Sequence, residues 1–239
     1  MGLRDEIRSD LDALVGGAWS VREGRVVPGT DDVRLFTNDA VKLDAVYLYA
    51  DLLGSTRLAR DFPWETAGKV IRAALRTASK IIESYGGEIR SYDGDRVMAI
   101  FITGAKNTTA AECALKINYA MRRIVEPALY AEFPELERAG FDVRMSVGIA
   151  SGDAVITRAG VRGSSDLVSI GRAPNIAAKL SDIRAEAYYR VYITESVYHS
   201  LLEDSKYDND GNDMWSRYVT DVGGERMTTY RTSYWWGIG

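Results

Sequence analysis

The order of hydrophobic and polar segments predicts an α+β fold, with helices packed on a mostly antiparallel sheet. Strand-like and helix-like segments follow one another as β-α-ββ-α-ββ-α-β. Two of the strand pairs are separated only by short turns, which is typical of antiparallel neighbours rather than of a doubly wound parallel sheet. The 239 residues are 46% hydrophobic, which is enough for one medium domain with extensions or at most two small domains.

The first expected elements are a helix, a connector and a strand. Residues 3–15 have the apolar spacing of a short amphipathic helix, and the Gly-, Pro- and Asp-rich VVPGTDDV at 26–33 is typical of a connector. Residues 44–51, DAVYLYAD, are rich in Val, Leu and Tyr without helical spacing. They predict a buried strand that ends on an acid, and we expect the main domain to begin there.

Two long helices and a hairpin are expected next. Pro63 marks the start of a helix that runs to about residue 85, where two glycines close it. The hairpin spans residues 88–102, with Asp93-Gly94 as its turn signal. The second long helix spans about residues 108–129.

The remaining segments complete the sheet. FDVRMSVGIASGDAVITRAG at 141–160 predicts two strands joined at a Gly/Ser/Asp turn, and PNIAAKLSDIRAE at 174–186 predicts a third helix with Pro174 near its start. RVYIT resumes a strand, and residues 215–239 are expected to form a hairpin centred on Gly223-Gly224. The predicted parts are an N-terminal helix and connector (1–43), a main domain (44–199) and a C-terminal β-hairpin extension (200–239).

Composition excludes several classes of function. The net charge of −4, with both signs interspersed, predicts no nucleic-acid partner. Cys113 is the only cysteine, which excludes an internal disulfide and a cysteine-based zinc site. The only histidine, His199, lies in a peripheral segment, which argues against a Ser/His or Cys/His catalytic pair. The N-terminus lacks the apolar run of a signal peptide or membrane span, so we expect a cytoplasmic protein.

Acids at the strand ends indicate a metal site. Tyr49 and Asp51 share one face of their strand, and LLGST at 52–56 then offers backbone N–H groups and two hydroxyls that suit phosphate oxygens. Asp95, near the hairpin tip, is the natural second carboxylate, because two adjacent acids repel unless they share Mg²⁺ or Mn²⁺. The alternative is that Asp93 and Asp95 are solvated turn residues and that Asp51 caps a helix.

Four segments together resemble the catalytic domain of the class III nucleotidyl cyclases. They are YADLLGST, YDGDRVMAIF, VRMSVGIASGDAV and GRAPNIAAKL, and they match the family in order and spacing over about residues 46–194. The resemblance implies an antiparallel sheet with flanking helices and a head-to-tail homodimer with two active sites at the subunit interface. It also implies a nucleoside triphosphate substrate and two Mn²⁺ or Mg²⁺ ions per site.

The resemblance assigns a metal and phosphate site residue by residue. Asp51 and Asp95 match the two metal-binding aspartates, and the main-chain carbonyl of Leu52 matches the third metal contact. The triphosphate-binding turn corresponds to Leu53, Gly54, Ser55 and Thr56.

The third helix resembles the family's second group of functional residues. Asn175 and Lys179, four residues apart on one helical face, match the asparagine that orients the ribose and the residue that stabilises the transition state. The latter is usually an arginine, and lysine keeps its charge but loses the bidentate fork. The alternative is that both are surface residues of an amphipathic helix.

Several positions depart from the family pattern. Ser146 replaces the strand arginine before the VGI segment, and Arg144, two residues earlier on the same face, is the substitute candidate for the phosphate contact. The two base-reading positions hold Ser91 and Val168, which supply none of the family's purine contacts. Tyr49 stands where phenylalanine is usual, and its hydroxyl would narrow or polarise the pocket. The alternative is that Tyr49 packs in the core.

These departures favour a base smaller than a purine. The segment RSYDGDRVMAIF is also similar to the bacterial pyrimidine cyclases of the Pycsar anti-phage systems, which make cyclic UMP or cyclic CMP as an infection signal. The similarity implies a pyrimidine cyclase that acts in antiviral defence, with a downstream effector that binds the cyclic nucleotide. Between the two pyrimidines we favour UTP over CTP.

The chemistry that the family implies needs no protein nucleophile. The ribose 3′-hydroxyl attacks the α-phosphorus and gives a 3′,5′-cyclic nucleotide and pyrophosphate, which accounts for the missing catalytic histidine and cysteine. A general adenylate cyclase and a catalytically silent nucleotide-binding dimerisation module stay open as alternatives. Silent domains normally lose a metal aspartate, whereas this chain keeps both. The activator and the role of Trp235 and Trp236 are not predicted.

Overall fold

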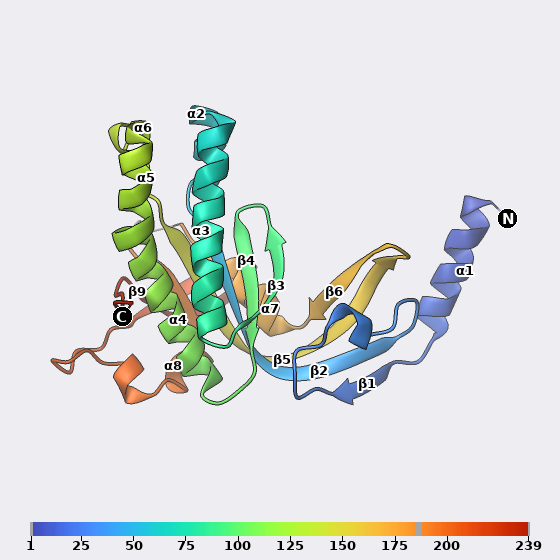
Figure 1. The fold of residues 1–239 in the computed structure, drawn as a ribbon. Coiled ribbons are helices and arrows are strands. Elements are labelled where there is room, and N and C mark those ends of the chain that lie inside the picture. The colour runs from blue at the N-terminus through green and yellow to red at the C-terminus, as the bar shows by residue number, and fades with distance from the viewer. Residues whose placement is uncertain (1, 185–187, 239) are drawn as a thin grey trace.

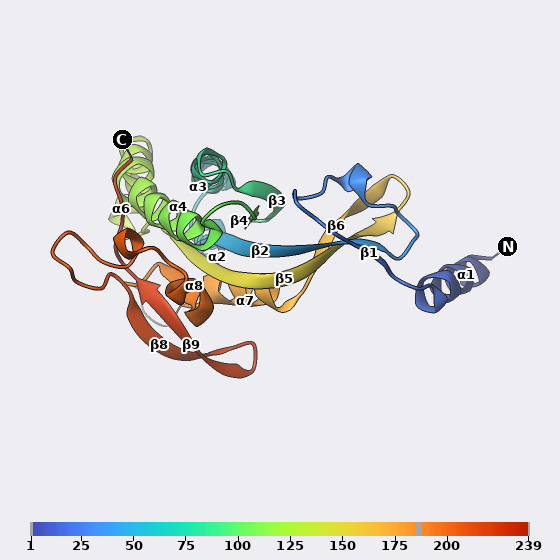
Figure 2. The same ribbon diagram turned by 90° about the horizontal axis from the view of Figure 1, so that it is seen from below.

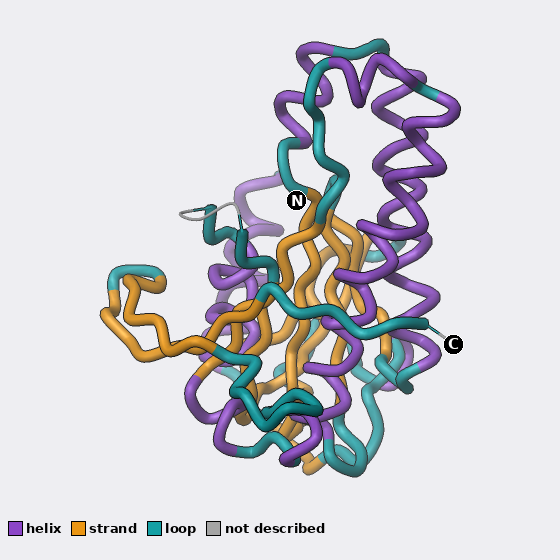
Figure 3. The backbone as a smooth tube through the Cα atoms, turned by 90° about the vertical axis from the view of Figure 1, so that its left-hand side faces the viewer, coloured by secondary structure: helices purple, strands orange, loops and turns teal. Residues whose placement is uncertain are grey.

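The computed structural model describes residues 2–184 and 188–238. Within them, one sheet carries helices on both faces (Figures 1 and 3). The helices are α1 (Leu3–Gly16), α2 (Ser55–Asp61), α3 (Trp64–Ser84), α4 (Lys106–Ala120), α5 (Glu126–Glu132), α6 (Pro134–Arg138), α7 (Arg172–Ser181) and α8 (Glu195–His199), with a π-helical turn at Met121–Val125. The strands are β1 (Ser20–Glu23), β2 (Asp39–Leu52), β3 (Glu88–Asp93), β4 (Arg96–Phe101), β5 (Met145–Val161), β6 (Ser164–Ile170), β7 (Val191–Thr194), β8 (Ser216–Val222) and β9 (Glu225–Thr232).

The sheet has the order β3-β4-β2-β5-β7-β9-β8, with β1 beside β2 and β6 beside β5. Only the β5–β7 and β1–β2 pairs are parallel among these described strands. The predicted α+β class with a mostly antiparallel sheet is therefore confirmed.

Two hydrophobic clusters cover opposite faces of the central strands, because side chains alternate along β2. Leu48 belongs to the cluster under α3 and α4, and Tyr47 to the cluster under α7. Figure 2 shows α3 and α4 on one side of the sheet and α7 on the other. Helix α7 approaches β5 closely because Gly148 has no side chain: a Cβ there would lie 2.1 Å from the carbonyl oxygen of Ala177.

The largest departure from the predicted elements concerns residues 141–160. The turn expected near Gly152 is wrong, because β5 passes through it without interruption. Thirteen consecutive residue pairs join β2 to β5, from Ala40–Thr157 to Leu52–Met145. This ladder supplies the backbone hydrogen bonds of the Ser-Gly-Asp segment, so tertiary pairing overrides its turn propensity. The chain reverses later, at Arg162-Gly163, into strand β6, where a loop was expected.

The other elements lie close to their predicted positions. The first long helix is α3, and the hairpin turn is Gly94-Asp95, one residue beyond the expected Asp93-Gly94. Gly94 has a φ of +60°, which glycine adopts without strain. Helix α2 and strand β1 were not predicted. Helix α7 ends at Ser181, so the prediction of a helix to residue 186 is wrong for residues 182–184, and residues 185 and 186 lie outside the described residues.

The second long helix contains a π-helical turn at Met121–Val125, between α4 and α5. A π-helical turn holds an extra residue, so the side chains after it are rotated by about 100° relative to an uninterrupted α-helix. Glu126, the first residue of α5, is only 9% exposed. The turn therefore directs a carboxylate into the protein.

The C-terminal hairpin is confirmed, with Gly223 and Gly224 at positive φ in the turn between β8 and β9. The chain then runs back across α4 (Figure 3). Trp236 donates its backbone N–H to the carbonyl oxygen of Leu115 at 3.3 Å, and the Arg122 guanidinium lies 4.5 Å from the Trp235 ring centroid. Both tryptophans thus pack on the helix. Among the described helices none is long and apolar enough to cross a membrane.

Adding a methyl group at Gly148 should destabilise the fold. Gly148→Ala places a Cβ 2.4 Å from the backbone nitrogen of Ser181, so α7 must move, and we expect a loss of about 3 kcal/mol in the free energy of unfolding in urea titrations. Gly68→Ala is the matched control: it lies inside α3 with open space around it, and should raise stability by about 0.5–1 kcal/mol. Equal midpoints for the two variants would contradict the close contact of α7.

Candidate active site

Three predicted site residues lie in adjacent rows across the strands. In one row Asp51 of β2 lies between Arg96 of β4 and Ser146 of β5. In the next row Tyr49 pairs with Met98 of β4, and Met98 pairs in turn with Ser91 of β3. Residues directly opposite in a sheet share a face, so Asp51, Tyr49 and Ser91 all face the side that carries α7. The structure brings these three together.

Asn175 and Lys179 lie on the exposed side of α7, as the four-residue spacing predicts. They line one cavity of about 520 Å³ together with Arg96 and Gly223. The tip of the C-terminal hairpin touches Lys179, since a Cβ on Gly223 would lie 2.8 Å from its Cδ. Asn175 and Lys179 therefore lie close to the row that contains Asp51, because they share this cavity with Arg96 of that row.

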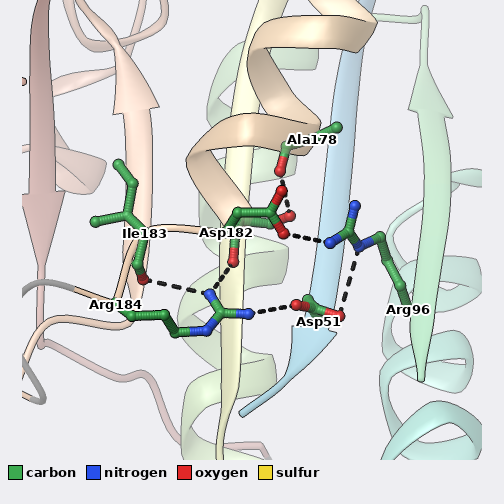
Figure 4. Close-up of polar contacts among 7 residues, drawn as sticks. Asp51, Arg96, Ala178, Asp182, Ile183 and Arg184 are labelled. Carbon is green, nitrogen blue, oxygen red and sulfur yellow. Dashed lines mark hydrogen bonds and ion pairs between the residues drawn. The ribbon is translucent and has the colours of Figure 1, made fainter. Parts of the chain in front are cut away.

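Two arginines hold the Asp51 carboxylate (Figure 4). Arg96 Nε lies 3.4 Å from Oδ1, and Arg184 Nη2 donates to Oδ2. Arg96 also pairs with Asp182 at the end of α7, and Arg184 Nη1 donates to the carbonyl oxygen of Ser181. The Asp51 side chain is only 8% exposed, so these guanidinium groups supply the countercharge that a buried carboxylate needs.

The charges around Asp51 act in opposite directions. Burial has the largest effect and raises the pKa of Asp51. Arg96 lowers this pKa, the nearby negative charge of Asp95 raises it, and Arg184 lowers it, with a net upward shift. The ionised form of Asp51 therefore depends on cations beside it.

The donors at this point fit a hard divalent cation. Asp51 and Asp95 offer carboxylate oxygens, and Leu52 donates its N–H to the Asp95 carbonyl oxygen at 3.2 Å, which places the hairpin turn against the end of β2. Ser146 Oγ, beside Asp51, is buried without a hydrogen-bond partner in the described part of the chain. No group of three or more His, Cys, Asp or Glu that could hold a metal occurs among residues 2–184 and 188–238. Mg²⁺ commonly takes one or two carboxylates, with water and substrate phosphates completing its shell.

The predicted phosphate turn borders a pocket of about 250 Å³. Leu53 and Gly54 form part of its wall, and Ser55 and Thr56 begin helix α2 directly after them. Gly54 has a φ of +77°, and a Cβ there would lie 3.3 Å from the Phe141 ring, so this position requires glycine.

Among the residues that the structure describes, four arginines and one acid, Asp142, line this pocket. The four arginines are Arg57, Arg144, Arg184 and Arg190. Burial, together with the like charge of Arg144, lowers the pKa of Arg190. Such an excess of positive charge suits a polyanion such as a triphosphate.

Arg144, the predicted phosphate contact, is partly committed to another partner. Its guanidinium binds Glu126 with both terminal nitrogens, and Nη2 lies 2.8 Å from Oε1. Tyr130 donates its hydroxyl to the Phe141 carbonyl oxygen at 2.9 Å and lies 3.2 Å from the same carboxylate. Burial and Glu126 raise the pKa of Tyr130 to about 12, so that hydroxyl stays protonated. Glu126 thus fixes Arg144 in the pocket wall.

Val168 is not brought to the other site residues. It lies on β6 opposite Thr157 of β5, whereas Asp51 lies opposite Ser146. Eleven residues separate Thr157 from Ser146 along β5, or about 36 Å at about 3.3 Å per residue. Val168 therefore cannot meet Asp51 within one chain.

The sequence did not reveal four cations of the site. Arg96 directly follows Asp95, and a cation next to a candidate metal ligand is a signal that could have been used. Arg57, Arg184 and Arg190 belong to no recognised motif. Arg184 reaches Asp51 across 133 sequence positions, a contact that only the folded chain defines.

Comparisons with known proteins identify the family. No protein-family model matches the chain. It is 39% identical over 236 residues to a uridylate cyclase of Rhodovulum sp. (strain MB263), with 98% of each chain covered. It is 40% identical over 240 residues to a uridylate cyclase of Burkholderia cepacia, with 100% of each covered. The chain belongs to the uridylate cyclase family.

Membership in the uridylate cyclase family makes the chain a nucleotide cyclase, and the predicted enzyme class is confirmed. A solved guanylyl cyclase superposes with a TM-score of 0.65 over 81% of this chain and 93% of that chain, at 16% sequence identity. That likeness shows the cyclase fold alone. The rows around Asp51 and the arginine-lined pocket are thus the candidate active site of a uridylate cyclase family member.

Removing one pocket arginine should weaken anion binding. Arg190→Gln deletes a partly buried positive charge, and we expect the dissociation constant of inorganic tripolyphosphate to rise about tenfold in isothermal titration calorimetry. Arg8→Gln, on the exposed helix α1, makes the same charge change outside the pocket and should leave binding within about twofold. Equal weakening by both variants would show that only net charge matters and would contradict the pocket.

Proposed function

We propose that this cyclase converts UTP to 3′,5′-cyclic UMP and pyrophosphate with two divalent metal ions per site. The observation that carries the proposal is the buried carboxylate of Asp51, placed next to a pocket lined by four arginines. Such a combination suits a metal-bound triphosphate. The names of the relatives at 39% and 40% identity support uracil as the base.

In the proposed reaction the ribose 3′-hydroxyl releases its proton to water and its oxygen forms a bond to the α-phosphorus. The bond from that phosphorus to the oxygen bridging the β-phosphate breaks, and pyrophosphate leaves. Asp51 and Asp95, with the Leu52 carbonyl as a further contact, would hold the divalent cations, and a bound cation would lower the pKa of the 3′-hydroxyl. The arginines around Gly54 bind the triphosphate and the departing pyrophosphate.

A second copy of the chain completes the proposed site. Val168 lies too far from Asp51 of its own chain, which supports a head-to-tail homodimer in which the partner supplies it. Within one chain Asn175 and Lys179 adjoin the Asp51 row only through Arg96. In the proposed head-to-tail homodimer we assign ribose orientation to Asn175 and stabilisation of the transition-state charge to Lys179 of the partner's α7. Their exposure on α7 is compatible with this arrangement.

The base surface proposed for uracil is small. Ser91, Met98 and Tyr49 form one row across three strands and offer two hydroxyls and no charged group. Burial raises the pKa of Tyr49, so its hydroxyl stays protonated and can donate to a carbonyl oxygen. Uracil has two carbonyl oxygens and cytosine one, which favours UTP over CTP.

The similarity of residues 90–101 to the Pycsar cyclases supports a role for cyclic UMP as a signal in anti-phage defence. An effector that binds the cyclic nucleotide would then receive the signal.

Loss of Asp95 should abolish cyclisation. Asp95→Asn removes a proposed metal ligand, and we expect less than about 1% of the wild-type rate of pyrophosphate release from UTP in Mn²⁺. Asp93→Asn is the matched control in the same turn: Asp93 is exposed, and at least about half of the activity should remain. Circular dichroism should show both variants folded. Equal rates in the two variants would refute the assignment of Asp95.

The nucleotide assay tests the substrate. Incubation with each of the four ribonucleoside triphosphates in Mn²⁺, followed by chromatography of the products, should give cyclic UMP predominantly, because the row around Tyr49 holds no purine-reading group. Dominant cyclic AMP would refute the pyrimidine assignment. Thermal stabilisation by UTP without release of pyrophosphate would instead support a silent nucleotide-binding module.

A further inference from the structure

Arg184 lies between the proposed metal position and the proposed phosphate position. Its Nη2 donates to the Asp51 carboxylate, and the same side chain lines the arginine pocket beside Gly54. Figure 4 shows the guanidinium directed at Asp51 from the segment that follows α7. The Arg184 side chain thus reaches both the Asp51 carboxylate, a proposed metal ligand, and the pocket where the triphosphate is proposed to bind.

The two arginines at Asp51 differ in how firmly they are held. Arg96 comes from β4, directly opposite Asp51 in the sheet, is 23% exposed and also pairs with Asp182. Arg184 is 42% exposed and comes from a connecting segment. Its other hydrogen bonds go to main-chain carbonyl oxygens of neighbouring residues, which water can replace. Arg184 is therefore the one that can leave Asp51.

We propose that Arg184 is an exchangeable counter-ion: it neutralises Asp51 until a divalent cation takes its place, and it then pairs with the triphosphate in the pocket beside Gly54. The inference rests on the proposed metal and triphosphate site but on no particular base. Asp51 keeps a cationic partner in both states, and the pocket gains a positive charge when the metal ion arrives. Metal and triphosphate consequently bind with positive coupling.

This coupling predicts changes in Mn²⁺ and tripolyphosphate binding by Arg184 variants that a purely structural role would not produce. In Arg184→Gln the metal no longer competes with a guanidinium, so Mn²⁺ alone should bind about tenfold more tightly, measured from free Mn²⁺ by electron paramagnetic resonance. Inorganic tripolyphosphate should bind about tenfold more weakly than to wild type when supplied with Mn²⁺. In EDTA its affinity should stay within about twofold of wild type, because Arg184 is then engaged with Asp51.

Two further variants sharpen the test. Arg190→Gln removes a charge from the same pocket without contact to Asp51, and should weaken tripolyphosphate binding with and without Mn²⁺ while Mn²⁺ affinity stays within about threefold. Arg184→Lys keeps the charge with fewer donors, and its Mn²⁺ affinity should lie between those of wild type and Arg184→Gln. Thermal melts verify folding, and the lysine variant carries the test if the glutamine variant unfolds.

Unchanged or weaker Mn²⁺ binding in Arg184→Gln would overturn the exchange, as would equal losses of tripolyphosphate affinity with and without Mn²⁺. Both measurements omit nucleotides and turnover. An absence of cyclic UMP in the nucleotide assay would therefore refute the proposed function without deciding the role of Arg184.

Discussion

The antiparallel pairing of β2 with β5 is the constraint on which the rest of the structure depends. Thirteen paired residues fix the register, and a slip by one residue would turn Asp51 and Tyr49 away from α7. The same pairing sets Gly148 beside Tyr49 and allows α7 to pack directly on the backbone there. The positions of Asp51 and Tyr49 relative to β5 and α7 thus follow from one ladder of hydrogen bonds.

Local sequence signals predicted most of the fold because they act over short distances. Pro63 and the glycines after Tyr85 bound a helix whose apolar face is continuous, and Gly94 and Gly223 mark turns that need positive φ. The turn predicted around Gly152 is wrong because pairing with a distant strand decides the structure there. Its composition favours a turn, but fourteen residues of β2 lie alongside to pair with β5, and that partner is distant in sequence.

The candidate site likewise contains residues that local sequence predicts and residues that only the folded chain brings together. Asp51, Gly54 and Asp95 stand in recognisable segments, and period-two alternation alone places Asp51 and Tyr49 on one face. Arg184 and Arg190 could not be predicted, because both lie outside the described helices and strands, at positions that only the folded chain defines. The separation of Val168 from Asp51 also required the structure, since it arises from the length of β5.

The π-helical turn at Met121–Val125 connects helix geometry to electrostatics. The extra residue rotates every following residue of α5 about the helix axis. Glu126, and not the residue next to it, therefore points at Arg144. A single deletion within the turn would restore regular α-helical hydrogen bonding and still remove Glu126 from its partner. The charge distribution of the anion pocket thus depends partly on one extra residue in the helical turn that precedes α5.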